Sequence, residues 1–160
     1  MAYKSSPRPV FDGPTPIPYA KVTRHIWGDA AAGLVDDWIY VSSGQIHQLV
    51  FGMPPGDGFR HSESFRTVFA ADEVLTVLMG TMVIANPETG EVHLVKTGES
   101  VFFQKDTWHH AFAWGNEELR VLAQENTVSK RRIPARRGNI LDVRGNLLAS
   151  STMVKNICAD

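Results

Sequence analysis

Histidine and acidic side chains gather in two places in the middle of the chain. The segment 58–80 contains His61, Glu63 and Glu73, and a second cluster is centred on His109. Two neutral imidazoles and one carboxylate make a nitrogen and oxygen ligand set suited to Fe(II), Mn(II), Ni(II), Co(II) or Zn(II). We therefore predict a divalent metal ion, with Fe(II) preferred.

We assign the three predicted metal ligands to His61, Glu73 and His109. Side chains alternate between the two faces of a strand, so His109 shares a face with Ala111 and Ala113. Two alanines beside a ligand leave room for a small substrate. A small barrel can enclose one such molecule.

Other polar residues near these ligands have candidate roles. We consider Glu63 as an alternative ligand or general base, although a solvated loop carboxylate is the more ordinary fate. His47 is a candidate fourth ligand or acid/base group, with a hydrogen-bonded core histidine as the alternative. Arg60, Arg66 and Gln104 are candidates for binding an anionic substrate, against the alternative of surface ion pairs.

The elements that must position these residues are short strands. Runs rich in β-branched and aromatic residues alternate with Gly, Pro, Asn and Ser turns, and no long segment of 3.6-residue period interrupts them. This spacing predicts an all-β sandwich or barrel. The predicted strands are 38–41, 45–51, 65–69, 73–79, 82–85, 91–96, 100–103, 108–114 and 119–123.

The two ends differ from the predicted barrel, which we place at residues 34–124. Five prolines in the first twenty residues predict an extended arm, assigned to 1–33, with a short helical turn over 24–33. Residues 1–124 carry 9 Lys and Arg against 14 Asp and Glu, whereas residues 125–160 carry 7 against 3. We interpret the basic segment as a solvated tail, because it has no aromatic residues among its positive charges and no nucleic-acid-binding motif.

Length and composition are those of a single globular domain. A chain of 160 residues with 43% hydrophobic residues fits one globular domain. A single cysteine, Cys158, argues against a disulfide framework, and no apolar run reaches the length of a membrane span. We therefore expect a cytoplasmic protein that binds neither nucleic acid nor membranes. A homodimer is expected, because Trp108, Phe112 and Trp114 share one strand face.

Several of these residues resemble the motifs of the cupin superfamily. Gly58, His61, Glu73 and Gly80 are similar to a variant of its first motif, and Gly98 with His109 is similar to its second. The resemblance covers roughly residues 45–124. It implies a double-stranded β-helix, or jelly-roll, barrel that holds a metal ion.

The chain departs from the family pattern at defined positions. The usual pair of histidines shortly before the glutamate is replaced by residues 66–69, and His61 lies earlier, with Glu63 where the second histidine would stand. In the second motif Gln104 replaces a proline, Asp106 replaces a glycine and Ala113 replaces an asparagine.

A second, short resemblance concerns the tail. Residues 137–149 are similar to the segment that follows the membrane anchor of penicillin-binding proteins. The transpeptidase motif of that family is absent, so the resemblance implies no cell-wall activity. Its physical interpretation is a hairpin turning at residues 144–146.

These observations favour a metal-dependent enzyme that acts on a small organic molecule, either a dioxygenase or another oxidoreductase. The same metal would also serve a lyase or isomerase, by polarising a carbonyl group. A non-catalytic module that binds or senses a small ligand is the other alternative, because fold does not select a reaction.

Overall fold

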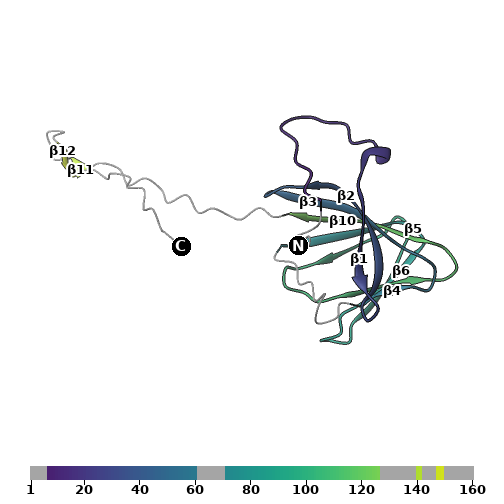
Figure 1. Ribbon diagram of the computed structural model, residues 1–160. Coiled ribbons are helices and arrows are strands. Elements are labelled where there is room, and N and C mark those ends of the chain that lie inside the picture. Colours follow the sequence, from purple (N-terminus) through teal and green to yellow (C-terminus); the bar gives the residue numbers. More distant parts are fainter. Residues whose placement is uncertain (1–6, 61–70, 127–139, 142–146, 150–160) are drawn as a thin grey trace. The chain divides into compact units, whose positions relative to one another are not determined.

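The short β-branched and aromatic runs form strands, as their spacing predicts. The structure is a computed structural model that describes residues 7–60, 71–126, 140–141 and 147–149. The chain divides into two units, Met1–Val128 and Ser129–Asp160. Within the described part of the first unit, strands form two antiparallel sheets, and the single helical element is a short 3-10 turn, η1 (Tyr19–Lys21) (Figure 1).

The larger sheet has six strands in the order β1-β2-β3-β10-β5-β8. All its neighbouring pairs are antiparallel. Its strands are β1 (Arg24–Asp29), β2 (Gly33–Ser42), β3 (Ile46–Met53), β10 (Leu119–Asn126), β5 (Glu73–Met79) and β8 (Ser100–Phe103).

The smaller sheet has four strands in the order β4-β9-β6-β7, also antiparallel throughout. Its strands are β4 (Gly58–Phe59), β9 (His110–Trp114), β6 (Thr81–Ala85) and β7 (Val92–Lys96). The chain therefore crosses between the sheets several times, for example from β5 to β6 and from β9 to β10.

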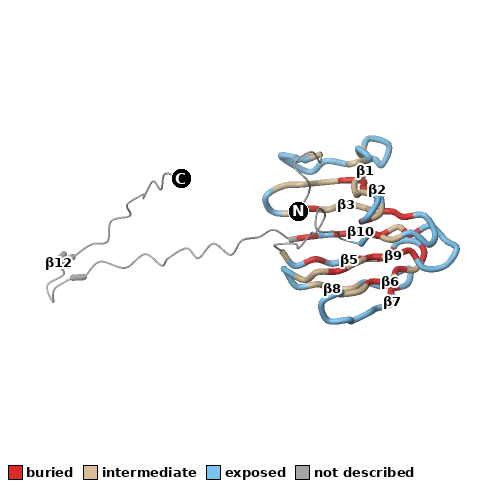
Figure 2. Tube along the Cα trace, turned by 60° about the horizontal axis from the view of Figure 1, so that its bottom comes forward, coloured by how far each residue is buried: buried red, intermediate tan, exposed pale blue. Residues whose placement is uncertain are grey.

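Buried side chains line the facing surfaces of the two sheets. Figure 2 shows the buried positions along the strands and the exposed ones in the connecting loops. Leu75 and Val121 of the larger sheet are buried in the same cluster as Met82 and Ile84 of the smaller one. Alternation along each strand produces this arrangement, because every second side chain points to the same face.

A glycine makes the tight turn between β5 and β6. Gly80 has a φ of 80°, and a Cβ added there would lie 2.6 Å from the carbonyl oxygen of Glu118. Only glycine fits this position without strain. The turn reverses the chain from the larger sheet into the smaller one.

The helical turn expected over residues 24–33 is wrong. These residues form β1 and the start of β2, joined by a tight loop. The Asp29 side chain accepts hydrogen bonds from the backbone N–H groups of Ala31 and Ala32, at 2.9 and 2.7 Å. Gly33 has a φ of 91°, which a helix cannot include. The three alanines are too few to overcome these turn signals.

Other differences concern the lengths of strands. β2 begins five residues earlier than expected, β10 continues three residues further, and β4 was not expected. The strand expected at 65–69 lies outside the described residues. In the second unit, β11 (Ile140–Leu141) and β12 (Leu147–Ala149) pair antiparallel, and the turn expected at residues 144–146 lies outside the described residues.

Candidate functional site

Glu73 begins β5 and points into the interior of the barrel. Its side chain alternates with solvent-facing Val74, so it shares the inner face with Leu75 and Val77. Glu73 is only 3% exposed. The backbone N–H of Lys105 donates a hydrogen bond of 3.0 Å to Oδ1 of Asp72, which ties the start of β5 to the loop after β8.

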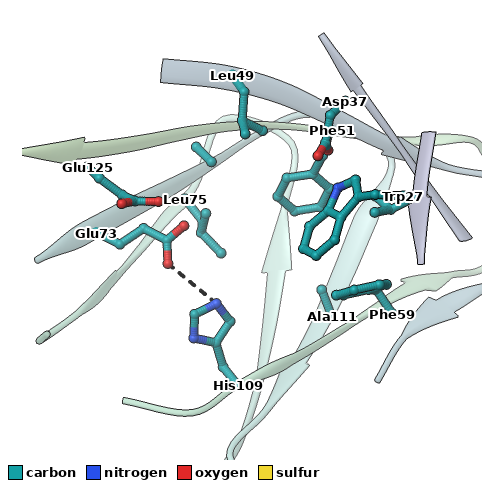
Figure 3. A pocket seen from close by; sticks show the side chains of 12 residues that line it. Trp27, Asp37, Leu49, Phe51, Phe59, Glu73, Leu75, His109, Ala111 and Glu125 are labelled. Carbon is teal, nitrogen blue, oxygen red and sulfur yellow. Dashed lines mark ion pairs between the residues drawn. The ribbon is translucent and has the colours of Figure 1, made fainter. Parts of the chain in front are cut away.

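His109 immediately precedes β9 and approaches Glu73 from the other sheet. It is 5% exposed, and Ala111 and Ala113 are buried on the same face, which confirms the predicted alternation. The imidazole stacks on the ring of Phe103, with 4.4 Å between centroids. Nε2 of His109 lies 3.4 Å from Oε2 of Glu73 (Figure 3).

The backbone fixes the tautomer of His109. Nδ1 lies 3.2 Å from the carbonyl oxygen of Thr107, and a carbonyl oxygen only accepts hydrogen bonds, so Nδ1 carries the proton. In the neutral ring, Nε2 then presents its lone pair towards Glu73. A histidine that ligates a metal ion is commonly held by the same kind of hydrogen bond.

A second buried carboxylate lies beside Glu73. Glu125 on β10 is directly opposite Glu73 in the strand register, and His47 on β3 is directly opposite Glu125. All three side chains are buried. The interior therefore holds a row of three ionisable groups on neighbouring strands.

Burial shifts the pKa values of these groups in the direction that favours their neutral forms. It raises the pKa of Glu73 to about 8, and the charge of Glu125 adds to the shift. Burial also raises the pKa of Glu125. It lowers the pKa of His109 to about 4, against the hydrogen bond to Thr107, and lowers that of His47 to about 4. Near neutral pH the contact between Glu73 and His109 thus joins a carboxylic acid and a neutral imidazole.

Glu73 and His109 suit a metal ion as two of its ligands. Oε2 of Glu73 is buried and has no hydrogen-bond partner among the described residues, although it faces Nε2 of His109. Two metal–ligand bonds of about 2.1 Å at a tetrahedral angle span about 3.4 Å between donor atoms. Within the described ranges, no group of three His, Cys, Asp or Glu side chains is arranged to hold a metal. The predicted third ligand, His61, lies outside those ranges.

The pair borders a cavity of about 60 Å³ inside the barrel. Figure 3 shows Glu73, Glu125 and His109 at one end, with Asp37 and Trp27 at the other. Apolar side chains line the space between them. The described lining residues are Trp27, Val35, Asp37, Leu49, Phe51, Phe59, Glu73, Leu75, His109, Ala111, Ala123 and Glu125.

Comparison with known proteins identifies the architecture. No protein-family model matches this chain, and no curated protein matches it by sequence. A predicted oxalate decarboxylase from Thermotoga maritima matches with a TM-score of 0.60 and 17% identity, over 71% of this chain and 100% of that one. A cupin 2 conserved barrel domain protein from Rhodopseudomonas palustris matches with a TM-score of 0.55 and 17% identity, over 69% and 75% of the two chains. This chain has the cupin fold.

The predicted all-β jelly-roll barrel is thereby confirmed. A third cupin-like neighbour is a polyketide cyclase from Streptomyces resistomycificus, with a TM-score of 0.56 and 16% identity, over 72% of this chain and 81% of that one. Identities this low establish a shared fold, and fold alone does not select a reaction. No helix in the described part of the chain is long and apolar enough to cross a membrane.

One departure from the cupin motif has a structural explanation. Asp106 stands where the motif has a glycine, and its φ is 63°. Aspartate tolerates this left-handed conformation better than most residues. The turn that leads to His109 is therefore kept without the glycine.

The cupin barrel brings together only some of the predicted site residues. Glu73 and His109 meet at the cavity, whereas buried His47 lies in the same row but outside the cavity lining. Arg60 is exposed after β4. Gln104 borders a separate pocket of about 300 Å³, near His93. His61, Glu63 and Arg66 lie outside the described residues.

Sequence reasoning missed two buried acids of this barrel. Glu125 continues the inward alternation of Leu119, Val121 and Ala123, so a strand extended by two residues would have found it. Asp37 also lies within a strand, but its neighbour Asp36 made the segment look like a loop. Asp36 faces the other side and binds Arg24 at 2.7 Å.

Proposed function

We propose that this protein is a metal-dependent enzyme that acts on a small organic molecule, with Glu73 and His109 as two ligands of a divalent metal ion. The approach of buried Oε2 of Glu73 to Nε2 of His109, at the end of the cavity, carries the proposal. Imidazole and carboxylate are ligands of Fe(II), which we favour, and of Mn(II), Ni(II), Co(II) and Zn(II). His61 is the proposed third ligand.

The residues around the pair prepare it for this role. The Thr107 carbonyl holds the proton of His109 on Nδ1, and Phe103 limits the rotation of the ring. Neutral Glu73 must release its proton to become a ligand, so metal binding would release a proton. A bound metal would supply oxidation chemistry with dioxygen or polarise a substrate carbonyl. The surrounding apolar side chains would keep bulk water away.

We propose oxidoreductase chemistry of the dioxygenase kind, with lyase or isomerase chemistry at the same metal as the alternative. Two neighbours of this fold are described as enzymes of small molecules, a predicted oxalate decarboxylase and a polyketide cyclase. They support small-molecule chemistry without selecting one reaction.

A metal-free binding module is the second candidate. It is favoured by the raised pKa of Glu73 and the lowered pKa of His109, which make the pair stable without a cation. In that case the cavity would bind its ligand through hydrogen bonds and apolar contacts alone.

Metal analysis decides between the two candidates. The full chain is purified without chelator, stripped, and titrated anaerobically with Fe(II), Mn(II), Ni(II), Co(II) and Zn(II), with metal content measured by elemental analysis. We expect one equivalent of metal in the wild type and its loss in Glu73→Gln and His109→Ala. Matched controls are Glu91→Gln and His93→Ala, an exposed glutamate and histidine that pair with each other at 2.9 Å. A wild type that binds no metal contradicts the enzyme proposal and favours the binding module.

Oxygen consumption then tests the reaction type. The metal-loaded protein is assayed with phenols, diketones and aminothiols in an oxygen electrode. Consumption that depends on both metal and substrate supports a dioxygenase. Substrate conversion without oxygen uptake supports the lyase or isomerase alternative.

We also propose a homodimer. Trp114 is 64% exposed at the end of β9, next to half-buried Phe112 and Trp108 on the same strand face. A second copy would cover this aromatic surface. Sedimentation analysis of the wild type and of Trp114→Ser measures this, with a shift to monomer expected in the variant.

A further inference from the structure

The cavity has a polar group at each end, and the proposed chemistry uses only one of them. Asp37 lines the wall opposite Glu73 and His109 and is 4% exposed (Figure 3). It lies in the middle of β2, with Phe51 directly opposite on β3. A carboxyl group removed from water needs polar partners, because burying it without them destabilises the fold.

The surroundings of Asp37 favour a carboxyl group that carries a proton. Burial raises its pKa well above the usual range, while a hydrogen bond from the Trp27 indole acts in the opposite direction. The ionisable residue across the strand register on β1 is His25, which is not part of the cavity lining. The Trp27 indole lies close to the Asp37 carboxyl, and a protonated carboxyl has an O–H to donate. Asp37 lines the cavity, which offers space for an acceptor.

The charges around the cavity select the ligand. Its described lining contains three carboxyl groups and one imidazole, and includes no lysine or arginine. In the metal-free protein, an anion would therefore enter an apolar space whose described lining offers no positive side chain to balance it. The middle of the cavity is apolar, with Leu49, Phe51, Phe59 and Leu75. A volume of about 60 Å³ favours a small ligand.

We propose that the cavity binds a small uncharged molecule and that the Asp37 carboxyl O–H donates a hydrogen bond to a carbonyl or hydroxyl oxygen of that molecule. The other polar group of the ligand then lies at the Glu73–His109 end. This inference deepens the proposed function, and it rests on that function where it assigns the Glu73–His109 end of the cavity to the reacting group of the ligand. Asp37 is a positioning residue that, in the metal-free protein, selects neutral molecules over anions. This differs from the anionic substrate predicted for Arg60, Arg66 and Gln104.

A matched pair of probes tests the selection. Propanamide and propanoate have nearly the same shape, but only the amide is neutral at pH 7. Each is titrated into chelator-treated full-length protein, and the indole N–H signal of Trp27 is followed by NMR. We expect propanamide to shift this signal in a saturable manner and propanoate to bind at least tenfold more weakly. Equal binding of the two probes overturns the proposal.

Variants at Asp37 test the hydrogen bond. Asp37→Leu removes the donor and is expected to weaken propanamide binding about tenfold, the effect of about one hydrogen bond. Asp37→Asn keeps a donor of similar shape and is expected to stay within about threefold of the wild type. Asp36→Asn is the control, because Asp36 faces the other side of β2, where it pairs with Arg24. Wild-type affinity in Asp37→Leu, or an equal loss in Asp36→Asn, contradicts the inference.

A further measurement keeps the test decisive if Asp37→Leu does not fold. The carboxyl carbon of Asp37, labelled with ¹³C in the wild type, is expected to shift on addition of propanamide, and an unchanged signal overturns the proposal. Because these titrations use metal-free protein, they are separate from the metal analysis. If the protein binds propanamide but no metal, the proposed metal-dependent enzyme is contradicted and the role of Asp37 is kept. If it binds metal but propanamide affinity does not depend on Asp37, the role of Asp37 is contradicted and the metal-dependent enzyme is kept.

Discussion

Glu73 and Glu125 lie directly opposite each other on β5 and β10, with both carboxyl groups buried on the inner face of the barrel. A negative charge on either carboxyl group disfavours ionisation of the other, and burial disfavours ionisation of both. The interior therefore accepts the two glutamates as acids more readily than as carboxylates.

Replacing Glu125 should relieve this repulsion. In Glu125→Gln we expect the pKa of Glu73 to fall only part of the way towards its ordinary value, because burial still raises it and only the smaller contribution of the Glu125 charge is gone. The metal-free variant should be more stable than the wild type at pH 9 by about 1 kcal/mol, and nearly equal at pH 5. Urea unfolding at both pH values measures the difference. If Glu125→Gln is more stable than the wild type by the same amount at pH 5 and at pH 9, the gain comes from packing and not from the removed charge.

The stability of the metal-free protein should fall as the pH rises from about 6.5 to 8. The native state keeps a proton on Glu73 up to about pH 8, and the raised pKa values of Asp37 and Glu125 act in the same direction. The unfolded chain releases these protons above about pH 4.5, so ionisation favours unfolding, by up to about 1.4 kcal/mol per pH unit for each group. Below pH 6.5 the depressed pKa values of His47 and His109 oppose this trend, because the unfolded chain then binds their protons.

Thermal and urea unfolding between pH 5 and 9, in the presence of chelator, measure this profile. The variant Glu73→Gln should have a shallower decline above pH 6.5, since one of the three acids is removed. A wild type whose stability increases from pH 6.5 to 8 would contradict the prediction.

The stacking of Phe103 on His109 should matter for the metal site. Phe103→Leu removes the ring that holds the imidazole, so we expect metal affinity to fall about tenfold. Phe102→Leu is the matched control, because Phe102 is the adjacent residue and is 57% exposed. Competition with a metal-binding dye measures both affinities. Equal losses in the two variants would show that the effect is not specific to the stacked ring.

Gly80 and Gly98 both have positive φ, but only Gly80 is crowded. A Cβ at residue 80 would approach the Glu118 carbonyl, whereas one at residue 98 would have no atom within 4 Å. We expect Gly98→Ala to cost about 1 kcal/mol from backbone strain alone, and Gly80→Ala to cost at least about 2 kcal/mol. Chemical denaturation of both variants compares them. Similar costs would mean that the β5–β6 turn relaxes around the added methyl group.

The strand pattern of this chain could be predicted because its signals are local. Gly80 ends β5 and Gly98 precedes β8, and the predicted bounds of both strands match the structure. The same local signal placed Glu73 and His109 on inward faces. Their meeting was predicted from the resemblance to cupins, since spacing alone does not say which strands face each other.

The rest could not be predicted because it depends on contacts between distant strands. Asp37 looks like a surface residue in the sequence, and the pairing of β2 with β3 places it on the inner face. For Glu125, the pairing of β10 with β3 and β5 extends the strand far enough to include it. β1 was missed because its partner, β2, supplies the hydrogen bonds that override the helical tendency of three alanines. The burial of the two acids and the strand conformation of β1 thus depend on pairing between strands.

The contact between Glu73 and His109 also joins the two sheets, because Glu73 belongs to the six-stranded sheet and His109 leads into the four-stranded one. A metal ion or ligand that binds both side chains would link the two sheets to each other. Separation of β9 from the rest of the barrel would then require release of that ion or ligand. Amide hydrogen exchange along β9 should therefore slow when the site is filled, and would report occupancy without any knowledge of the substrate.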